Sequence, residues 1–257
     1  MRNTPEISVI IPYYKKRFYF QKTLNSILKQ SFQKFEVIII YDDLNKNELG
    51  FIKKISKKNS KIKLITNNKN LGPGLSRNKG ILQSRGTYIA FCDADDIWKK
   101  DKLNLQIKFM KKYNLNFSHT NYFVIDKKDK KVGKFKAKSK IEYQDLLKSC
   151  DIGLSTVIVK KNLLKKNLFC KLQTKEDFYL WLQIIKKEKK IFSINKYLSS
   201  WRYLENSLSS SISQRLIDAF RLYYAKEKNN FFTSVYYVLR LSYYALIKKL
   251  KIYKSYG

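Results

Sequence analysis

The chain has 257 residues, of which 44% are hydrophobic and 15% aromatic, which is enough for a buried core and excludes wholesale disorder. Its formal net charge of +34 comes from 54 Lys and Arg residues spread along the whole chain. Three interpretations compete: nucleic-acid binding, attraction to an anionic membrane, and a compositional bias toward lysine. No aromatic nucleic-acid-binding motif is present, so no nucleic acid is expected as the main partner.

The three cysteines, Cys92, Cys150 and Cys170, lie far apart in the sequence. Their spacing matches no zinc-site pattern, and their odd number argues against a disulfide framework. We therefore expect a protein of the reducing cytoplasm.

The first hundred residues alternate between strands and helices. Short apolar runs predict strands over residues 8–12, 36–41, 62–66 and 87–92. Apolar residues at helical spacing predict helices over 20–28, 49–55 and 77–84, with a turn-rich loop over 67–74. This order predicts an α/β fold with a doubly wound, mostly parallel, Rossmann-like sheet. In such a sheet, ligands bind beyond the carboxyl ends of the strands.

After residue 100 the predicted helices and strands are longer. Helices are predicted over 101–113, 143–150 and 176–188, and extended segments over 116–126, 156–159 and 190–203. From about residue 214 onward the chain is helical, aromatic and basic. We therefore divide it into a domain over residues 1–210, with parts 1–115 and 116–210, and a helical tail over 211–257.

Acidic residues are scarce in the first hundred residues, and five of the eight present directly follow two predicted strands. Asp93, Asp95 and Asp96 follow the strand 87–92. Alternate residues of an extended segment point the same way, so Asp93 and Asp95 can share one ligand. Carboxylate oxygens suit a hard cation such as Mg²⁺ or Mn²⁺. The alternative is that Asp95 or Asp96 caps a following helix, worth about 1 kcal/mol.

Asp42 and Asp43 follow the strand 36–41. A carboxylate at this edge can accept a hydrogen bond from a ribose hydroxyl or a base N–H, as in other α/β nucleotide sites. The alternative is turn formation with Asn45. The residues alone leave both interpretations open.

Several segments, in order, resemble the family 2 glycosyltransferases, which have a GT-A fold. They are residues 8–14, 24–30, 36–43, 70–81 and 86–98. The resemblance implies transfer of a sugar, with inversion, from a nucleotide-diphosphate donor. The donor site that it implies consists of Pro12 and Tyr14 in the nucleotide pocket, Asp42 or Asp43 on the nucleoside, Arg77 and Asn78 beside the donor, and Asp95 as principal metal ligand together with Asp93.

Arg77 also has chemical support, since a guanidinium is a natural bidentate partner of a diphosphate. The alternative is an arginine on the surface of its helix. Two departures from the family pattern are visible. Lys15 stands where an Asn usually follows the first strand, and Leu44 with Asn45 replaces the usual Gly-Ser.

Glu176 and Asp177 begin the predicted helix 176–188. The resemblance implies that Asp177 is the general base toward the acceptor hydroxyl, with Glu176 as its supporting neighbour. A carboxylate in the first turn of a helix stays ionised and can accept a proton. The alternative is that both residues only satisfy the helix N-terminus.

The segment 201–209 resembles a late family motif, in which Arg202 is expected to close over the diphosphate. Many members carry His where this chain has Leu204, which leaves the third protein ligand of the metal open, with Glu205 as a substitute. The only histidine, His119, is expected to be a structural residue with satisfied hydrogen bonds.

Residues 231–257 contain eight aromatic and five basic residues and no acidic one. The apolar part, 231–247, is short and interrupted by Arg240, which argues against a membrane-spanning helix. We expect a helix that lies on an anionic membrane, at the inner face of the cell membrane. The alternative is a helical cap packed on the core.

The resemblance implies a metal-dependent glycosyltransferase. The basic tail suggests a glycan or lipid-linked acceptor, as in cell-surface polysaccharide biosynthesis. Two alternatives stay open. One is a non-catalytic nucleotide-sugar-binding or scaffold protein, and the other is a basic nucleic-acid-binding protein.

Overall fold

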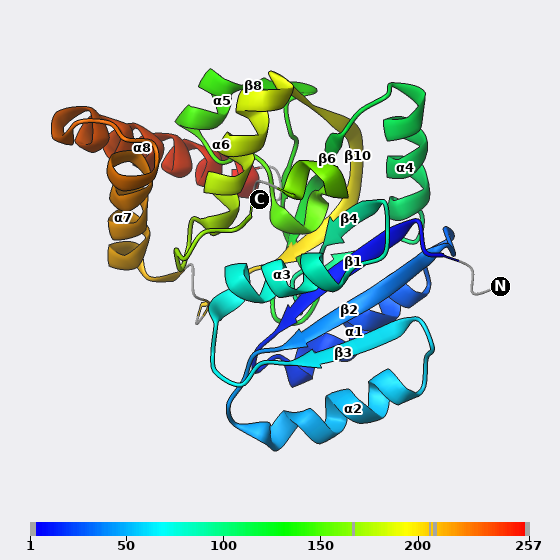
Figure 1. The fold of residues 1–257 in the computed structure, drawn as a ribbon. Coiled ribbons are helices and arrows are strands. Elements are labelled where there is room, and N and C mark those ends of the chain that lie inside the picture. Colours follow the sequence, from blue (N-terminus) through cyan, green and yellow to red (C-terminus); the bar gives the residue numbers. More distant parts are fainter. Residues whose placement is uncertain (1–3, 166–167, 206, 208–209, 255–257) are drawn as a thin grey trace.

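The computed structural model describes residues 4–165, 168–205, 207 and 210–254, which form one mixed sheet of ten strands with helices on both faces (Figure 1). Eight strands follow one path, in the order β3-β2-β1-β4-β9-β6-β10-β5. The first four on this path are parallel: β1 (Ile7–Tyr13), β2 (Phe35–Tyr41), β3 (Ile62–Thr66) and β4 (Tyr88–Phe91). The doubly wound order predicted for the first hundred residues is confirmed.

The second half of the sheet is mixed. Its strands are β5 (Ile97–Trp98), β6 (Phe117–Ile125), β7 (Lys131–Phe135), β8 (Lys140–Glu142), β9 (Ile158–Lys160) and β10 (Lys190–Arg202). β9 lies between β4 and β6 and runs antiparallel to both, whereas β10 runs parallel to β6. Hydrophobic periodicity is the same for either strand direction, so the sequence does not reveal the reversal at β9.

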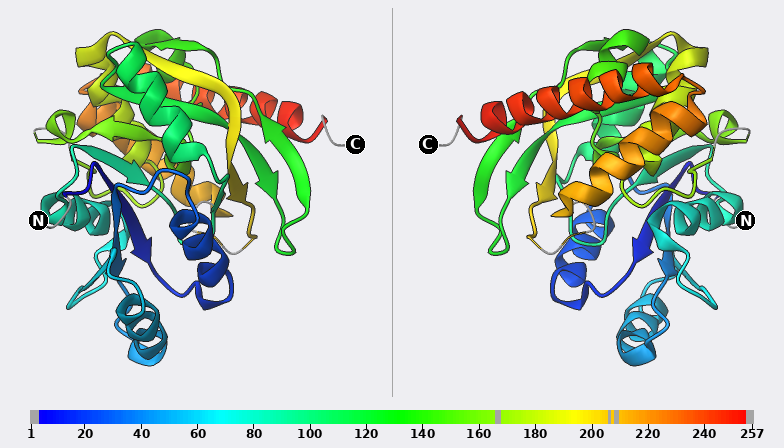
Figure 2. Two further views of the ribbon diagram at one scale, coloured as in Figure 1. Left: turned by 90° about the vertical axis from the view of Figure 1, so that its right-hand side faces the viewer. Right: turned by 90° about the vertical axis from the view of Figure 1, so that its left-hand side faces the viewer.

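Six helices flank the sheet. They are α1 (Arg17–Leu28), α2 (Leu49–Lys57), α3 (Gly72–Gln83), α4 (Lys102–Lys112), α5 (Tyr143–Lys148) and α6 (Glu176–Glu188). Successive side chains of β1 point to opposite faces of the sheet and belong to two separate hydrophobic cores. Val9 and Ile11 pack with α1, α2 and α4, and Ile10 packs with α3 and α6, so that helices cover both faces (Figure 2).

α3 begins at Gly72 rather than at residue 77. Gly72 has a φ of 78°, in the left-handed region that favours glycine, and Pro73 occupies the first helical turn. Proline is pre-organised for that position, because its missing N–H would find no partner within the helix. The turn residues of this segment therefore start a helix instead of extending a loop.

One side of the C-terminal tail packs against the rest of the domain. It consists of α7 (Ile212–Arg221), a π-type turn (Leu222–Lys226) and α8 (Phe231–Lys254). Leu222, Tyr223 and Leu241 belong to the core that contains α6, and Ile252 packs with residues of β6. This side of the tail therefore packs on the core, which was the alternative to membrane binding. Within the described part of the chain, no helix has the length and apolar character needed to cross a membrane.

His119 lies in β6 with a fully buried side chain. Neither ring nitrogen has a hydrogen-bond partner among the described residues. Burial, and then the nearby charge of Lys248, lower the pKa of His119 to about 3, so the ring is neutral at physiological pH. His119 is structural, as predicted, but the expectation of satisfied hydrogen bonds is wrong, because β6 is buried along most of its length.

Replacing His119 by leucine should make the protein less sensitive to acid. The folded-state pKa lies below the unfolded value of 6.5, so the unfolded chain takes up the proton and stability falls as the pH drops below 6.5. Between pH 8 and pH 5 the wild type should lose about 2 kcal/mol more than His119→Leu, measured by urea unfolding. Equal losses in both proteins would contradict this.

Candidate active site

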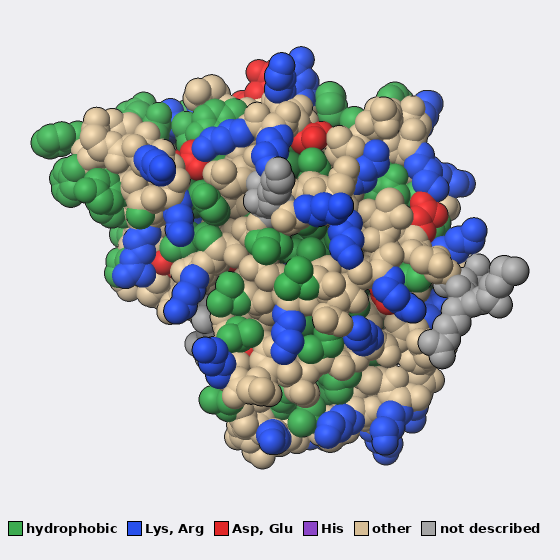
Figure 3. Space-filling view, in the orientation of Figure 1, with side chains coloured by type: hydrophobic (Ala, Val, Ile, Leu, Met, Phe, Trp, Pro, Cys, Tyr) green, Lys and Arg blue, Asp and Glu red, His purple; other side chains and the backbone are tan. Residues whose placement is uncertain are grey.

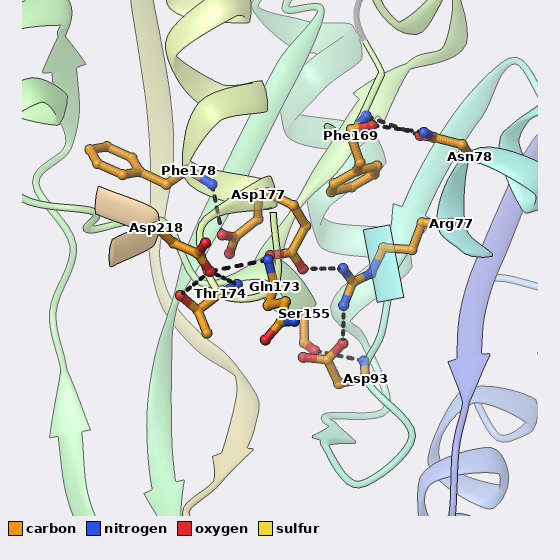
Figure 4. A network of polar contacts seen from close by, with 11 residues as sticks. Arg77, Asn78, Asp93, Ser155, Phe169, Gln173, Thr174, Asp177, Phe178 and Asp218 are labelled. Atoms are coloured by element: carbon orange, nitrogen blue, oxygen red, sulfur yellow. Dashed lines mark hydrogen bonds and ion pairs between the residues drawn. The ribbon is translucent and has the colours of Figure 1, made fainter. Parts of the chain in front are cut away.

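Arg77 connects the two acidic parts of the predicted site. It lies on α3, and its side chain is almost fully buried. Its Nη2 donates to Asp93 Oδ1 at 2.7 Å, and its Nη1 donates to Glu176 Oε1 at 2.8 Å (Figure 4). Burial alone would lower the pKa of Arg77, but the two carboxylates outweigh burial and raise it. The helix-surface alternative for Arg77 is therefore wrong.

Close packing surrounds this bridge. The Arg77 guanidinium carbon lies 5.3 Å from the centre of the Phe169 ring. Asn78 donates to Phe169 O at 2.8 Å and accepts from Phe169 N at 3.0 Å, so its amide binds the protein main chain. At Gly74, a Cβ atom would come within 2.9 Å of Glu176 Cγ. Glycine at this position lets α3 approach the start of α6 closely.

Glu176 and Asp177 occupy the first turn of α6, as predicted. Burial, and then the charge of Asp177, raise the pKa of Glu176 to about 7, while Arg77 opposes this rise. Burial also raises the pKa of Asp177, again against the effect of Arg77. Asp177 is partly exposed, and its Oδ1 accepts from Phe178 N at 2.7 Å. The pair thus satisfies a helix N-terminus and also presents carboxylates suited to holding a proton.

The acidic segment after β4 starts no helix. β5 follows it, and the next helix begins at Lys102, so the helix-cap alternative for Asp95 and Asp96 is wrong. Asp96 accepts from Arg202 N at 2.9 Å, and burial raises its pKa well above the ordinary value. Asp95 Oδ2 lies 2.7 Å from Lys16 Nζ, and burial raises the pKa of Asp95 as well.

Arg202, at the end of β10, binds oxygen atoms of the protein. Its Nε donates to Asp95 O at 2.9 Å, its Nη1 donates to Asp126 O at 2.7 Å, and its Nη2 lies 2.5 Å from Asp129 Oδ1. The guanidinium also stacks 4.5 Å from the centre of the Tyr19 ring. Arg202 therefore fixes the main chain of Asp95 against the β6–β7 turn, a contact that the sequence did not predict.

Two carboxylates of the segment, those of Asp93 and Asp95, suit a hard cation. Among the described residues, no group of three or more His, Cys, Asp or Glu side chains is placed to hold a metal. At the late motif, Leu204 is apolar and Glu205 is exposed. Asn206, Leu208 and Ser209 of that motif lie outside the described residues. Because Mg²⁺ typically uses one or two carboxylates plus substrate phosphates, the donor set fits Mg²⁺ or Mn²⁺ held jointly with a diphosphate.

The end of β1 contributes Pro12, which is buried, and leads to Tyr14, which is 42% exposed. Lys15 then has a φ of 48°, in the left-handed region. Asn is several-fold enriched in that region, which gives a physical reason for the Asn usual at this position. The backbone turn is kept here with lysine.

Asp42 and Asp43 lie at the neighbouring end of β2 and are both buried. Asp42 Oδ1 accepts from Asn67 Nδ2 and from Leu71 N, each at 2.8 Å, so it orders the loop before α3. Asp43 Oδ1 accepts from Asn45 N at 3.1 Å, which is the turn contact considered as its alternative role. A nucleoside role for either residue stays a prediction.

Asp218 and Ser155, two residues of the network in Figure 4, were not among the predicted site residues. Asp218, on α7, is fully buried, and its Oδ2 accepts from Gln173 N at 3.1 Å, Thr174 N at 3.0 Å and Thr174 Oγ1 at 3.1 Å. It therefore holds the loop that leads into α6. Ser155 Oγ accepts from Asp93 N at 3.0 Å. The only sequence signal for Asp218 was a single acidic residue in a basic helix.

Comparison with known proteins identifies the family. The sequence model described as glycosyl transferase family 2 matches residues 8–172. WfgD of Escherichia coli, named as a UDP-Glc:α-D-GlcNAc-diphosphoundecaprenol β-1,3-glucosyltransferase, is 38% identical over 207 residues, which are 80% of this chain and 80% of WfgD. The chain therefore belongs to glycosyl transferase family 2.

Two solved structures have the same fold. Residues 1–349 of S. aureus TarS, in complex with UDP-GlcNAc, give a TM-score of 0.68 at 22% identity, covering 84% of this chain and 66% of that one. A mannosyltransferase from Pyrobaculum calidifontis, in complex with GDP-Man and Mn²⁺, gives a TM-score of 0.67 at 13% identity, covering 88% of this chain and 65% of that one. The chain thus spans just under two thirds of these two solved chains, and 39% of the longer solved chain of TarS, and the predicted GT-A fold is confirmed.

Replacing Arg77 by methionine should destabilise the fold by about 3–5 kcal/mol at pH 8, because two carboxylates would lose their buried counter-ion. The loss should shrink at pH 5. Glu176 already has a folded-state pKa of about 7, above the ordinary 4.5, so acid protonates it in the folded state and removes its need for a cation.

Urea unfolding of Arg77→Met at both pH values measures this effect, with Arg215→Met as a control because Arg215 is exposed on α7. Adding Glu176→Gln to Arg77→Met should recover part of the stability. A loss no larger than that of the control would contradict the bridging role.

Proposed function

We propose that this member of glycosyl transferase family 2 moves a hexosyl unit, with inversion, from a nucleotide-diphosphate sugar to an acceptor hydroxyl. The observation that carries the proposal is the Arg77 bridge, which brings Asp93 and the Glu176–Asp177 pair to one edge of the sheet. The name of WfgD supports a lipid-linked glycan acceptor. Such an acceptor places the reaction in cell-surface polysaccharide biosynthesis, at the inner face of the membrane.

In this proposal Asp177 is the base. It accepts the proton of the acceptor hydroxyl while that oxygen bonds to the anomeric carbon, and the bond from this carbon to the diphosphate oxygen breaks on the opposite face. Partial burial makes Asp177 a better proton acceptor than an exposed aspartate, because its pKa is raised. Glu176 supports it by anchoring the start of α6 to Arg77.

The donor lies across the ends of β1, β2 and β4 in this proposal. Pro12 and Tyr14, with Asp42 or Asp43, line the nucleoside end, and Asp93 and Asp95 hold Mg²⁺ or Mn²⁺. A bound cation would neutralise the charge of the departing diphosphate. Arg77 and Asn78 lie beside the donor in this scheme, and Arg202 lies near its diphosphate. All three also position the site, because their polar groups bind Asp93, Phe169 and Asp95.

Asp177→Asn should reduce sugar transfer about a thousandfold, because the amide cannot accept the proton. Binding of the donor should be unchanged, since Asp177 acts on the acceptor. For the wild type, kcat/KM should fall on the acid side at a pH above 3.8, since burial raises the pKa of the base. Transfer from UDP-glucose to a GlcNAc-diphospholipid acceptor at several pH values, followed by product analysis, measures the loss of transfer and the pH dependence. A separate binding measurement with UDP-glucose tests donor binding.

Asp145→Asn is a matched control for Asp177→Asn, because Asp145 is a partly exposed first-turn residue of another helix, α5. Asp95→Ala should instead weaken metal-dependent donor binding. Equal transfer by wild type, Asp177→Asn and Asp95→Ala would contradict the site. Donor binding by the wild type without any transfer would favour the non-catalytic alternative.

We also propose that the outer side of the tail lies on an anionic membrane. Six α8 side chains at alternating spacings of four and three residues are between 57% and 83% exposed: Phe232, Tyr236, Leu239, Tyr243, Leu246 and Leu250. This spacing places them in one stripe along the helix, opposite the buried Leu241. Hydrophobic side chains gather where α7 and α8 meet (Figure 3).

Charge favours a lipid partner over a second copy of the chain. The tail from residue 231 to the end has no acidic residue, so two copies packed stripe to stripe would bring only like charges together. Lys249 and Lys251 are exposed near the stripe. Apolar side chains flanked by lysines are typical of helices at anionic interfaces.

Phe232→Ser with Leu239→Ser should lower binding to phosphatidylglycerol vesicles about tenfold or more, because two large exposed side chains no longer enter the lipid. Flotation with vesicles measures this effect, and phosphatidylcholine vesicles should bind the wild type more weakly. Leu82→Ser is the control, since Leu82 is 72% exposed on α3. Unchanged flotation of the double variant would contradict the assignment.

A further inference from the structure

Lys16 forms an ion pair with Asp95, whose carboxylate is proposed as the principal metal ligand. It directly precedes α1, and its Nζ lies 2.7 Å from Asp95 Oδ2. The two side chains are 26% and 14% exposed, so the pair is only partly open to solvent. A divalent cation on the same oxygen would stand next to an ammonium group, where like charges repel strongly.

The two cations at the acidic segment differ in their freedom to move. Arg77, on Asp93, is 5% exposed and is held by a second carboxylate. Lys16 is more exposed and also lines a surface hollow of about 570 Å³, together with Lys15 and Arg17. Its flexible stem can therefore leave Asp95 without a change in the main chain.

The main chain of Asp95, in contrast, is fixed. Arg202 Nε donates to Asp95 O at 2.9 Å, and Arg202 is itself tied to the β6–β7 turn. The carboxylate thus stays in place when its partner changes. An exchange of cations at Asp95 requires the departure of the Lys16 ammonium alone.

We propose that Lys16 makes metal binding at Asp95 conditional on the donor. Without donor, the ammonium neutralises Asp95 and competes with the cation. A diphosphate brings additional negative charge, which attracts both the divalent cation and the released ammonium. Metal and diphosphate therefore bind with positive coupling, and each raises the affinity of the other by the same factor. This inference rests on the donor site proposed above.

The test measures Mn²⁺ binding directly, by electron paramagnetic resonance of free Mn²⁺, with and without UDP. Wild type should bind Mn²⁺ weakly alone and more tightly with UDP. Lys16→Gln should bind Mn²⁺ alone about tenfold more tightly than the wild type, and the coupling to UDP should fall accordingly. Adding Asp95→Asn to Lys16→Gln should abolish the gain.

Lys22→Gln is the matched control, because Lys22 lies on α1, the helix that Lys16 directly precedes, and pairs with Asp129 instead of Asp95. It should bind Mn²⁺ like the wild type. Lys16→Met serves as a second variant, and circular dichroism verifies the fold of each protein. Unchanged Mn²⁺ affinity in both Lys16 variants, with Mn²⁺ still bound in the presence of UDP, would overturn the role of Lys16 alone. Absence of Mn²⁺ binding in every variant, with or without UDP, would overturn the proposed metal site as well.

Discussion

A buried guanidinium between two carboxylates determines the geometry of the site. Arg77 joins Asp93, just after a central strand, to Glu176, which lies 99 residues after Arg77 in the chain. Glu176 is 8% exposed and would be a buried, uncompensated charge without Arg77, and the Arg77 charge is not stable there without its carboxylates. The three side chains therefore fix where α3, β4 and the start of α6 meet. The position of Asp177 follows from this junction.

The charges near the proposed donor site are already compensated within the protein. Arg77 and Lys16 neutralise Asp93 and Asp95, and Arg202 holds the main chain between them and the β6–β7 turn. Each of the two proposed metal-binding carboxylates thus already has a cationic partner within the protein. In the proposed donor site, a ligand that brings its own cation and diphosphate would exchange partners with these side chains, which needs less reorganisation than creating new charge in the site.

Local patterns were sufficient for the first four strands, for α6 and for the acidic residues, but not for the short strands β5, β7 and β8. Apolar runs and helical spacing located β1 to β4 and α6, and scarcity of acid in a basic chain drew attention to Asp93 and Asp95. What each side chain contacts depends on residues distant in sequence, which periodicity does not encode. For this reason the partners of Arg77, the inward direction of Arg202 and the hydrogen bonds of Asp218 became visible only in three dimensions.

The contacts of Asp218 show that the tail is structurally part of the proposed active site. A boundary at residue 210 would separate a catalytic unit from a detachable anchor, yet Asp218 lies beyond it and orders the backbone at Gln173 and Thr174, just before the proposed base. The same short helix exposes Ile212 and Leu216 on its outside. A chimera that exchanges tails between relatives would thus exchange part of the catalytic scaffold, and would need to carry this aspartate across with the anchor.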